Sequence, residues 1–267
     1  MNTPAQVVEA GGVTVSTTAQ AILNLASEKL LTLGEPALPA ITPGGIVPGT
    51  IQAGEWATIY GTSLAATTAT WTGNFPTSLG GTSVTIGGKA AFLSFASPGQ
   101  IDLQVPSVTG SGAVPVVVTT AGGSATANAT LASFAPSFFL LDSTHVAGII
   151  LRANGAYDIL GPTGSSLGYP TVAAKAGDSV ALFGTGFGPT NPTVAPGIVF
   201  SGAAPTTSAV TIRINNGNVT PTFAGLSGAG LYQINLTVPA GLGTGDVPLR
   251  ATVGGVQTNS GVVISLQ

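Results

Sequence analysis

The chain has 267 residues, a formal charge of −3 at pH 7 and only 6% charged residues. This charge excludes nucleic acid as a partner, because too few cations are present to neutralise a row of phosphates. The absence of cysteine excludes disulfides and thiolate zinc sites, and no apolar run reaches the ~18 residues that a membrane-spanning helix needs.

Residues 1–18 carry short β-prone runs around Gly11-Gly12 and have no counterpart in the rest of the chain. Three interpretations are open: a tail, an extra edge strand on its own domain, or a donor strand that pairs with an exposed sheet edge of the next subunit. We predict the donor strand, since head-to-tail strand addition does not close and therefore builds a filament. Its candidate subunit-contact residues are Val7, Val8, Val13 and Val15.

Residues 16–33 fit either a strand or a helix. Ala19 to Leu25 reads as a strand, whereas Ile22, Ala26 and Leu30 also fit a helical stripe. We predict a strand through Leu25 and an extended, proline-containing segment from Leu30 to Ile41.

Two copies of one pattern follow. "AGEWATIYGTSL" at 53–64 matches "AGDSVALFGTGF" at 176–187. The segment 82–106 matches 208–239 in the same way, and "GAVPVVVTTAGGSAT" at 112–126 matches "GDVPLRATVGGVQTN" at 245–259. Because the blocks keep their order and differ only by insertions at turns, the chain is predicted to be a tandem duplication.

Each copy is predicted to consist of short strands with apolar residues on one face and polar residues on the other. Glycine and Asn-Gly turn signals separate the strands. Alternating faces without helical crossovers predict an all-β fold of two tandem immunoglobulin-like β-sandwich domains, at 19–135 and 136–267, with an N-terminal strand extension at 1–18. The predicted strands are 84–86, 101–105, 116–119, 210–214, 232–238 and 249–253.

Between the copies, Asn154-Gly155 separates the apolar runs 149–151 and 157–160. This pattern predicts a β-hairpin that opens the second domain. Ala135-Pro136-Ser137 is the predicted joint, and the lack of a Gly/Ser linker there predicts a stiff pair of domains.

Three motifs carry a resemblance to a known family: "SPGQIDLQVP" at 97–106, "GTGFGPTNP" at 184–192 and "GLYQINLTVP" at 230–239. The blocks resemble Ig-like repeats of the IPT/TIG type and, more closely, a bacterial extracellular C-terminal domain family. The resemblance covers about residues 19–267 and implies a tandem β-sandwich module, extracellular or at the cell surface, without catalytic residues. Such modules usually end long proteins, so we expect that the module is the protein or that an export signal or further domains are missing.

The stretch "GTGFGPT" at 184–190 has the glycine content of a phosphate-binding loop. A Walker loop needs Gly-Lys-Ser/Thr so that the lysine reaches the phosphates, whereas Pro189 follows Gly188 here. The first copy has Ser63 at the place of Gly186. We therefore interpret the stretch as a turn that ends a strand.

His145 is the only histidine and lies three residues after Asp142. A catalytic triad needs residues that converge from separate elements, so His145 is interpreted as a turn residue. We predict that the protein is not an enzyme and has no cofactor and no metal. A calcium ion held by aspartates at the domain joint is the one alternative left open.

The acidic residues also fit structural roles. Glu55 and Asp178 hold equivalent places in the two copies, which predicts the same role at a turn. Asp102 is matched by Asn235, which favours a hydrogen-bonding position on a strand over a catalyst.

Trp56 and Trp71 are the candidate ligand-contact residues, and with Tyr60 and Tyr169 they would offer a platform for stacking a sugar. Trp56 is matched by Ser179 in the second copy, which suggests an outward position. Core packing or an intramolecular contact is the favoured alternative.

The leading functional hypothesis is a non-enzymatic extracellular structural protein that forms a surface fibre by strand addition of residues 1–18 to a neighbouring subunit. The alternative is an extracellular adhesion or carbohydrate-binding Ig-like module attached to the cell surface. The predicted partners are other copies of the chain or, in the alternative, a glycan or surface protein, with no nucleic acid and no membrane span.

Overall fold

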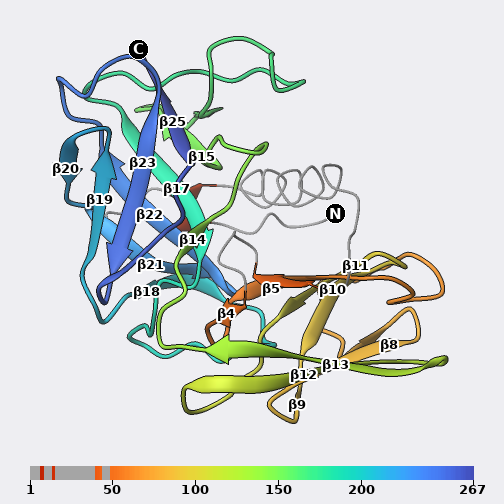
Figure 1. Cartoon of the computed structure of the whole chain (residues 1–267). Coiled ribbons are helices and arrows are strands. Elements are labelled where there is room, and N and C mark those ends of the chain that lie inside the picture. The colour runs from red at the N-terminus through yellow and green to blue at the C-terminus, as the bar shows by residue number, and fades with distance from the viewer. Residues whose placement is uncertain (1–6, 9–13, 16–39, 44–48) are drawn as a thin grey trace.

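The computed structural model describes residues 7–8, 14–15, 40–43 and 49–267, and every regular element in these ranges is a β-strand. The strands form two immunoglobulin-like β-sandwiches in tandem, drawn from orange to yellow-green and from green to blue in Figure 1. The predicted all-β fold is confirmed. The described ranges contain no helix long and apolar enough to cross a membrane. The prediction for residues 16–33 lies outside these ranges.

The first sandwich packs a five-stranded sheet against a six-stranded sheet. Its core consists of the alternating inward residues of both sheets, such as Val84 and Ile86 on one and Ile101 and Leu103 on the other. The first sheet has the order β3 (Ala40–Pro43), β5 (Trp56–Tyr60), β11 (Gln100–Gln104), β10 (Phe92–Ala96) and β6 (Ala69–Thr70). The second has the order β4 (Thr50–Ile51), β13 (Gly123–Leu131), β12 (Gly112–Thr120), β8 (Thr82–Ile86) and β7 (Ser78–Leu79), with β9 (Lys89–Ala90) beside β8.

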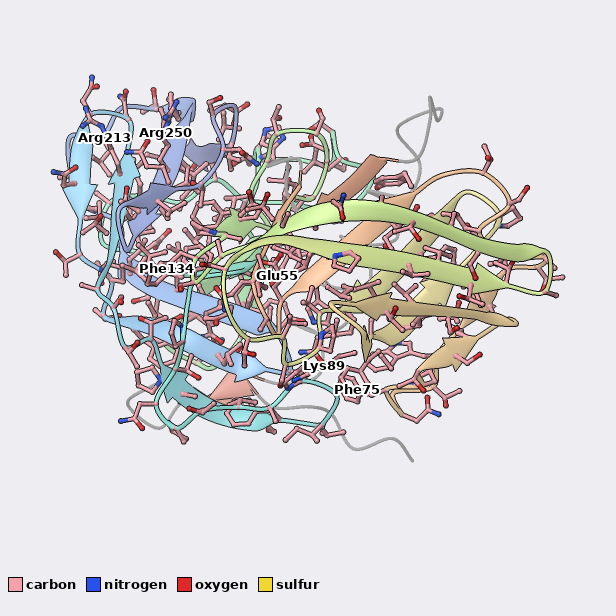
Figure 2. The ribbon with its side chains drawn as sticks, turned by 60° about the horizontal axis from the view of Figure 1, so that its bottom comes forward. Glu55, Phe75, Lys89, Phe134, Arg213 and Arg250 are labelled. Atoms are coloured by element: carbon pink, nitrogen blue, oxygen red, sulfur yellow. The ribbon has the colours of Figure 1, made fainter. Side chains whose placement is uncertain are left out.

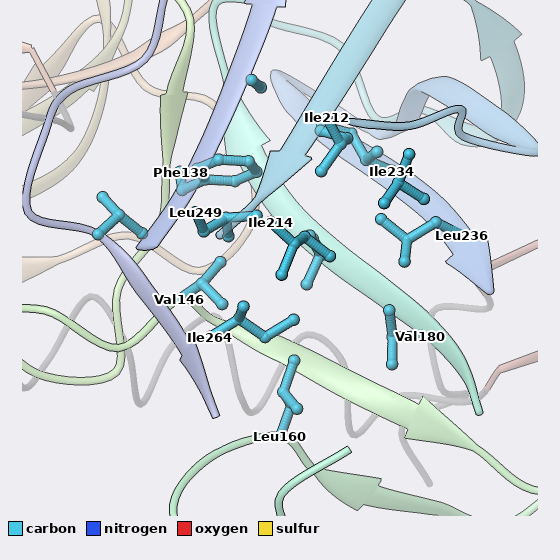
Figure 3. Close-up of a cluster of buried hydrophobic side chains, with 14 of the residues drawn as sticks. Phe138, Val146, Leu160, Val180, Ile212, Ile214, Ile234, Leu236, Leu249 and Ile264 are labelled. Atoms are coloured by element: carbon cyan, nitrogen blue, oxygen red, sulfur yellow. The ribbon is translucent and has the colours of Figure 1, made fainter. Parts of the chain in front are cut away.

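The second sandwich packs a seven-stranded sheet against a five-stranded sheet around the core shown in Figure 3. Ile212 and Leu249 reach this core from one sheet, and Val180 and Ile234 reach it from the other. The larger sheet has the order β16 (Tyr157–Ile159), β15 (Gly148–Leu151), β17 (Ser179–Thr185), β22 (Leu231–Thr237), β21 (Phe223–Gly228) and β18 (Ser201–Pro205), with β14 (Ser137–Phe138) beside β17. The smaller sheet has the order β20 (Gly217–Val219), β19 (Val210–Ile214), β23 (Gly245–Val253) and β24 (Val256–Gln257), with β25 (Val263–Leu266) beside β23.

All six predicted strands are present; 210–214 has the predicted ends, and the other five are shifted by one or more residues at one or both ends. The predicted hairpin is also present, since β15 pairs with β16 in the antiparallel sense. The side chain of Asn154 accepts a hydrogen bond from the N–H of Ala156 across this turn, which explains the Asn-Gly signal.

The two sandwiches share side-chain hydrogen bonds and turn conformations at equivalent positions. Gln100 donates to Asp102 at 2.9 Å, and at the equivalent place Gln233 donates to Asn235 at 2.8 Å. The predicted hydrogen-bonding role of Asp102 on a strand is therefore confirmed. Ser63 and Gly186 both have positive φ angles, 55° and 75°, so the stretch that resembles a phosphate loop is the turn after β17.

The N-terminal extension contributes two short strands, β1 (Val7–Val8) and β2 (Thr14–Val15). The two strands pair with each other in the antiparallel sense, and β1 lies beside β18 and β21 of the same chain. Val13 lies outside the described residues. The pairing of this extension with a neighbouring subunit remains a prediction.

Candidate functional site

The sandwiches meet through one end of the first domain, formed by the turn 52–55 and the start of β5. Gln52 bridges the joint, because its amide oxygen accepts from the N–H of Gly188 at 2.7 Å and its amide nitrogen donates to the hydroxyl of Tyr232 at 3.2 Å. Gln104 makes a second bridge, with its amide oxygen accepting from the N–H of Gly197 at 2.9 Å. Both glutamine side chains are buried and hydrogen-bonded, as buried amides require.

Trp56 belongs to this joint. Its indole N–H donates to the carbonyl of Ala229 at 2.8 Å, and its backbone N–H donates to the hydroxyl of Thr185 at 3.0 Å. Both acceptors belong to the second domain, so Trp56 makes the intramolecular contact that was the favoured alternative. Ser179, its counterpart, is exposed because the equivalent end of the second domain is not covered by another sandwich in the structure.

That equivalent end of the second domain is polar. Lys175 replaces Gln52 and is exposed, and Thr237 replaces Gln104 and is exposed. Asp178 replaces Glu55, accepts from the backbone N–H of Lys175 and pairs with Arg152 at 3.4 Å. The residue differences between the copies therefore distinguish the end of the first domain, which the second domain covers, from the equivalent end of the second domain, which is open.

Beside the joint, Trp56 begins an aromatic cluster that reaches the surface. Trp71, directly after β6, lies edge-on to Trp56 with ring centroids 5.7 Å apart. Phe75 lies edge-on to Trp71 at 4.7 Å and also contacts Phe92 of β10 at 6.4 Å. These are favourable aromatic geometries. We call Trp71, Phe75 and Phe92 the aromatic patch; all three residues are partly exposed.

Two further observations concern the aromatic patch. Phe75 has a φ of 48°, a backbone conformation that is rare for a bulky residue and costs about 1–3 kcal/mol. Gly197 packs so closely on Phe92 that a Cβ there would lie 2.2 Å from the ring, and the next two residues are Ile198 and Val199. These two are 51% and 78% exposed, so exposed apolar residues directly follow the glycine that packs on Phe92.

The structure brings together only part of the predicted sugar-stacking platform. Trp56 and Trp71 are in contact, but Tyr60 lies at the far end of β5 opposite Gln100, and Tyr169 lies in the second domain near Asp142. The residues that sequence reasoning missed are Phe75 and Phe92.

His145 sits between two carboxylates. Its Nδ1 lies 2.7 Å from Asp142 and its Nε2 lies 3.2 Å from Asp246. Burial alone would lower the pKa of His145, but the two aspartates outweigh it and raise the pKa. Ser265 donates its hydroxyl to Asp246 and not to the imidazole, so the nucleophile–base contact of a hydrolase is absent from this cluster. His145 therefore ties the loop 142–145 to β23.

Glu55 is the most unusual titratable group in the described residues. Its side chain is fully buried at the domain joint, and neither carboxyl oxygen has a hydrogen-bond partner within the described ranges. Burial raises the pKa of Glu55 well above its usual range, and the nearby backbone N–H of Gln52 offsets this only in part. Burial also raises the pKa of the adjacent Tyr232 to about 12.

No group of three histidine, aspartate or glutamate side chains in the described part of the chain is arranged to hold a metal ion. Two concave areas of the second domain are lined by apolar and uncharged polar residues, such as Val238 and Leu242 in one and Thr222 and Asn235 in the other. Their walls lack the acid–base pairs that catalysis uses.

Residues 39–134 match the model of the IPT/TIG domain family. The first sandwich is an IPT/TIG domain. The aromatic patch lies wholly within it, and the joint connects the IPT/TIG domain to a second sandwich with the same turn and strand pattern. No curated protein gives a significant match to the chain.

Similar solved structures include two proteins of Bacteroides glucan utilization loci. The mixed-linkage glucan SGBP-B of Bacteroides ovatus, solved with a mixed-linkage heptasaccharide, is 12% identical with a TM-score of 0.35, over 88% of this chain and 44% of that one. The SGBP-B of a complex xyloglucan utilization locus in Bacteroides uniformis is 14% identical with a TM-score of 0.24, over 85% and 48%. This chain therefore spans less than half the length of either protein.

A chimeric titin Z1Z2 is similar as well, at 18% identity and a TM-score of 0.22, over 87% of this chain and 99% of that one. These likenesses concern the fold and carry no argument about a ligand.

Proposed function

We propose that this protein is a non-catalytic extracellular module that binds a neutral glycan at the aromatic patch of its IPT/TIG domain. The observation that carries the proposal is the partly exposed aromatic patch itself, in which Phe75 is held in a strained backbone conformation. Backbone strain of this kind is concentrated at functional sites.

The loop 71–77 supplies both kinds of contact that a sugar needs. Aromatic rings offer apolar faces for the C–H surface of a pyranose ring. Thr72 and Asn74 are exposed on the same loop and present a hydroxyl and an amide, which can hydrogen-bond to sugar hydroxyls. Neither this loop nor the loop 194–200 contains a charged residue, which favours a neutral ligand.

A glycan array with the intact protein and with Trp71→Ala tests the proposal. We expect the intact protein to bind at least one neutral oligosaccharide, Trp71→Ala to lose that binding, and Trp71→Phe to retain part of it. Val256→Ala, which alters an exposed apolar side chain of the second domain, serves as the control and should bind like the intact protein. Equal binding by Trp71→Ala, or no binding by the intact protein, would refute the proposal.

The filament hypothesis is a second candidate with a different observation behind it. Because β1 lies beside β18 and β21 of its own chain, the same hairpin seated on a neighbouring chain would be a strand swap. We expect this route to give concentration-dependent polymers that disappear when residues 1–18 are deleted. Light scattering that shows a monomer at all concentrations would dismiss it.

A further inference from the structure

Two arginines lie side by side on the outer face of the smaller sheet of the second domain. The register of β19 and β23 places Arg213 directly opposite Arg250, and both side chains are exposed. Figure 2 shows them at the same end of the molecule, far from Phe75. They are two of only six lysines and arginines in the chain.

Neither guanidinium is neutralised by a carboxylate within the described ranges. Arg213 donates from Nε to the carbonyl of Asn215 at 3.3 Å, and Arg250 donates to the amide oxygen of Gln257 at 3.4 Å. A guanidinium has five N–H donors, so most of the donors of both residues have no partner within the described ranges. By contrast, Arg152 is paired with two aspartates.

The nearest acid on the outer side of β23 is Asp246, four residues before Arg250. At ~3.3 Å per residue this separation is about 13 Å along the strand. Asp246 is also occupied, because it accepts from Ser265 at 2.6 Å and pairs with His145 at 3.2 Å. It is therefore not a counter-ion for the arginine pair.

Like charges directly opposite each other on neighbouring strands destabilise a sheet. For two exposed side chains this cost is modest, and an anion that bridges them would remove it. Opposite positions hold their Cβ atoms about 5 Å apart, so the two planar guanidinium groups can meet one carboxylate or sulfate group from both sides.

The surroundings of the arginine pair are polar and uncharged. Asn218 lies opposite Arg213 on β20, and Thr252 lies opposite Gln257 on β24. Asn218 and Gln257 are exposed. An open sheet face lined by amides and hydroxyls can hydrogen-bond to the hydroxyls that flank an acidic group on a sugar chain.

We infer that this face binds the acidic groups of an anionic polysaccharide, with Arg213 and Arg250 holding one carboxylate or sulfate between them. A net charge of −3 and only two clustered cations suit a sparsely charged polymer better than nucleic acid. The exposed apolar residues near the arginines, Pro248 and Val256, are not the Trp, Phe or Leu anchors of membrane-surface segments, so the face suits insertion into a lipid surface poorly. The site is independent of the glycan site proposed for the IPT/TIG domain.

Affinity electrophoresis of the full chain in gels that contain polygalacturonate, dextran sulfate or neutral dextran tests this inference. The first polymer offers carboxylates and the second offers sulfates, so the retarding polymer identifies the acidic group. We expect retardation by at least one anionic polymer at low salt and none by dextran. Each of Arg213→Gln and Arg250→Gln should weaken binding about tenfold, the typical effect of losing a charge-assisted hydrogen bond.

The double variant Lys89→Gln/Lys175→Gln is the matched control, because it removes the same charge from two other exposed positions. It should bind like the intact protein, as should Trp71→Ala, whereas Arg213→Gln/Arg250→Gln should lose binding. Equal losses in the two double variants would show non-specific attraction and overturn the inference. Absence of retardation by either anionic polymer, or binding to phosphatidylglycerol vesicles alone, would overturn it too.

Discussion

The buried carboxyl group of Glu55 leads to a prediction about stability and pH. Because burial raises the pKa of Glu55 in the folded protein above its value in the unfolded chain, the folded state keeps a proton that the unfolded state releases. Unfolding free energy must then fall as pH rises between the unfolded pKa, near 4.5, and the folded pKa. Below the pKa of the unfolded state, Glu55 is protonated in both states, so it causes no such loss of stability.

The slope of this loss follows from proton linkage and is about 1.4 kcal/mol for each pH unit in that window. For a chain of this size, 1 kcal/mol corresponds to roughly 2–4 °C in melting temperature. The variant Glu55→Gln removes the ionisable group and keeps its shape. We expect its amide to be as poorly partnered as the protonated carboxyl, at a cost that is the same at every pH.

We therefore expect the two proteins to have similar stability near pH 5 and Glu55→Gln to become the more stable one as the pH rises to about 8. Urea denaturation at a series of pH values, followed by tryptophan fluorescence, measures this difference, since Trp56 lies at the same joint. Asp178→Asn is the control at the equivalent place, where the carboxylate is paired with Arg152, and it should be destabilising. Parallel pH profiles for the intact protein and Glu55→Gln would refute the reasoning.

Three further predictions concern single residues. Gly186→Ala should destabilise the protein by about 3 kcal/mol or more in urea denaturation, because a Cβ there would lie 2.0 Å from the carbonyl oxygen of Ala135 and the φ angle is 75°. His145→Gln should lower the melting temperature below the raised pKa of His145 and have less effect at alkaline pH, because the ion pairs with the two flanking aspartates need the charged imidazole. Asp102→Asn should raise the melting temperature at neutral pH, since burial raises the pKa of Asp102 and the second domain already carries Asn235 in the same hydrogen bond; a lower melting temperature would contradict it.

The fold was predictable because its main signals are local and occur twice. Alternation of apolar and polar residues gave strands such as β19 and β23, and Asn154-Gly155 gave the β15–β16 hairpin. The matching blocks then required two similar domains. Side-chain identity at turns was informative as well, since Ser63 and Gly186 share a positive φ.

The contacts between the domains were harder to predict, because they depend on tertiary placement. The mismatch between Trp56 and Ser179 left an outward position and an intramolecular contact both open, and only the structure shows that the indole N–H binds the second domain. The sequence signal for the domain contact was the set of differences between the copies: Gln52 corresponds to Lys175, and Gln104 corresponds to Thr237. The glutamines are buried where the second domain covers the end of the first domain, and their counterparts are exposed at the uncovered end of the second domain. This difference becomes visible only after the two copies are aligned.

The aromatic patch was only half predicted. Trp71 was a candidate because its ring can stack on a sugar, whereas no sequence motif pointed to Phe75 or Phe92. Their contact joins a loop to β10, and the periodicity of apolar residues cannot predict a contact between a loop and a strand. The backbone strain at Phe75 is visible only in three dimensions.

The polar end of the second domain limits how sandwiches of this kind can be stacked. The second sandwich covers one end of the IPT/TIG domain. If a third sandwich covered the equivalent end of the second domain, Lys175 and the ion pairs of Arg152 would lose contact with water. Burying charges in this way costs several kcal/mol per ion. Terminal units of repeat arrays carry such polar outer faces as caps. Docking a further sandwich at this end of the second domain would therefore cost more free energy than the docking seen at the covered end of the IPT/TIG domain.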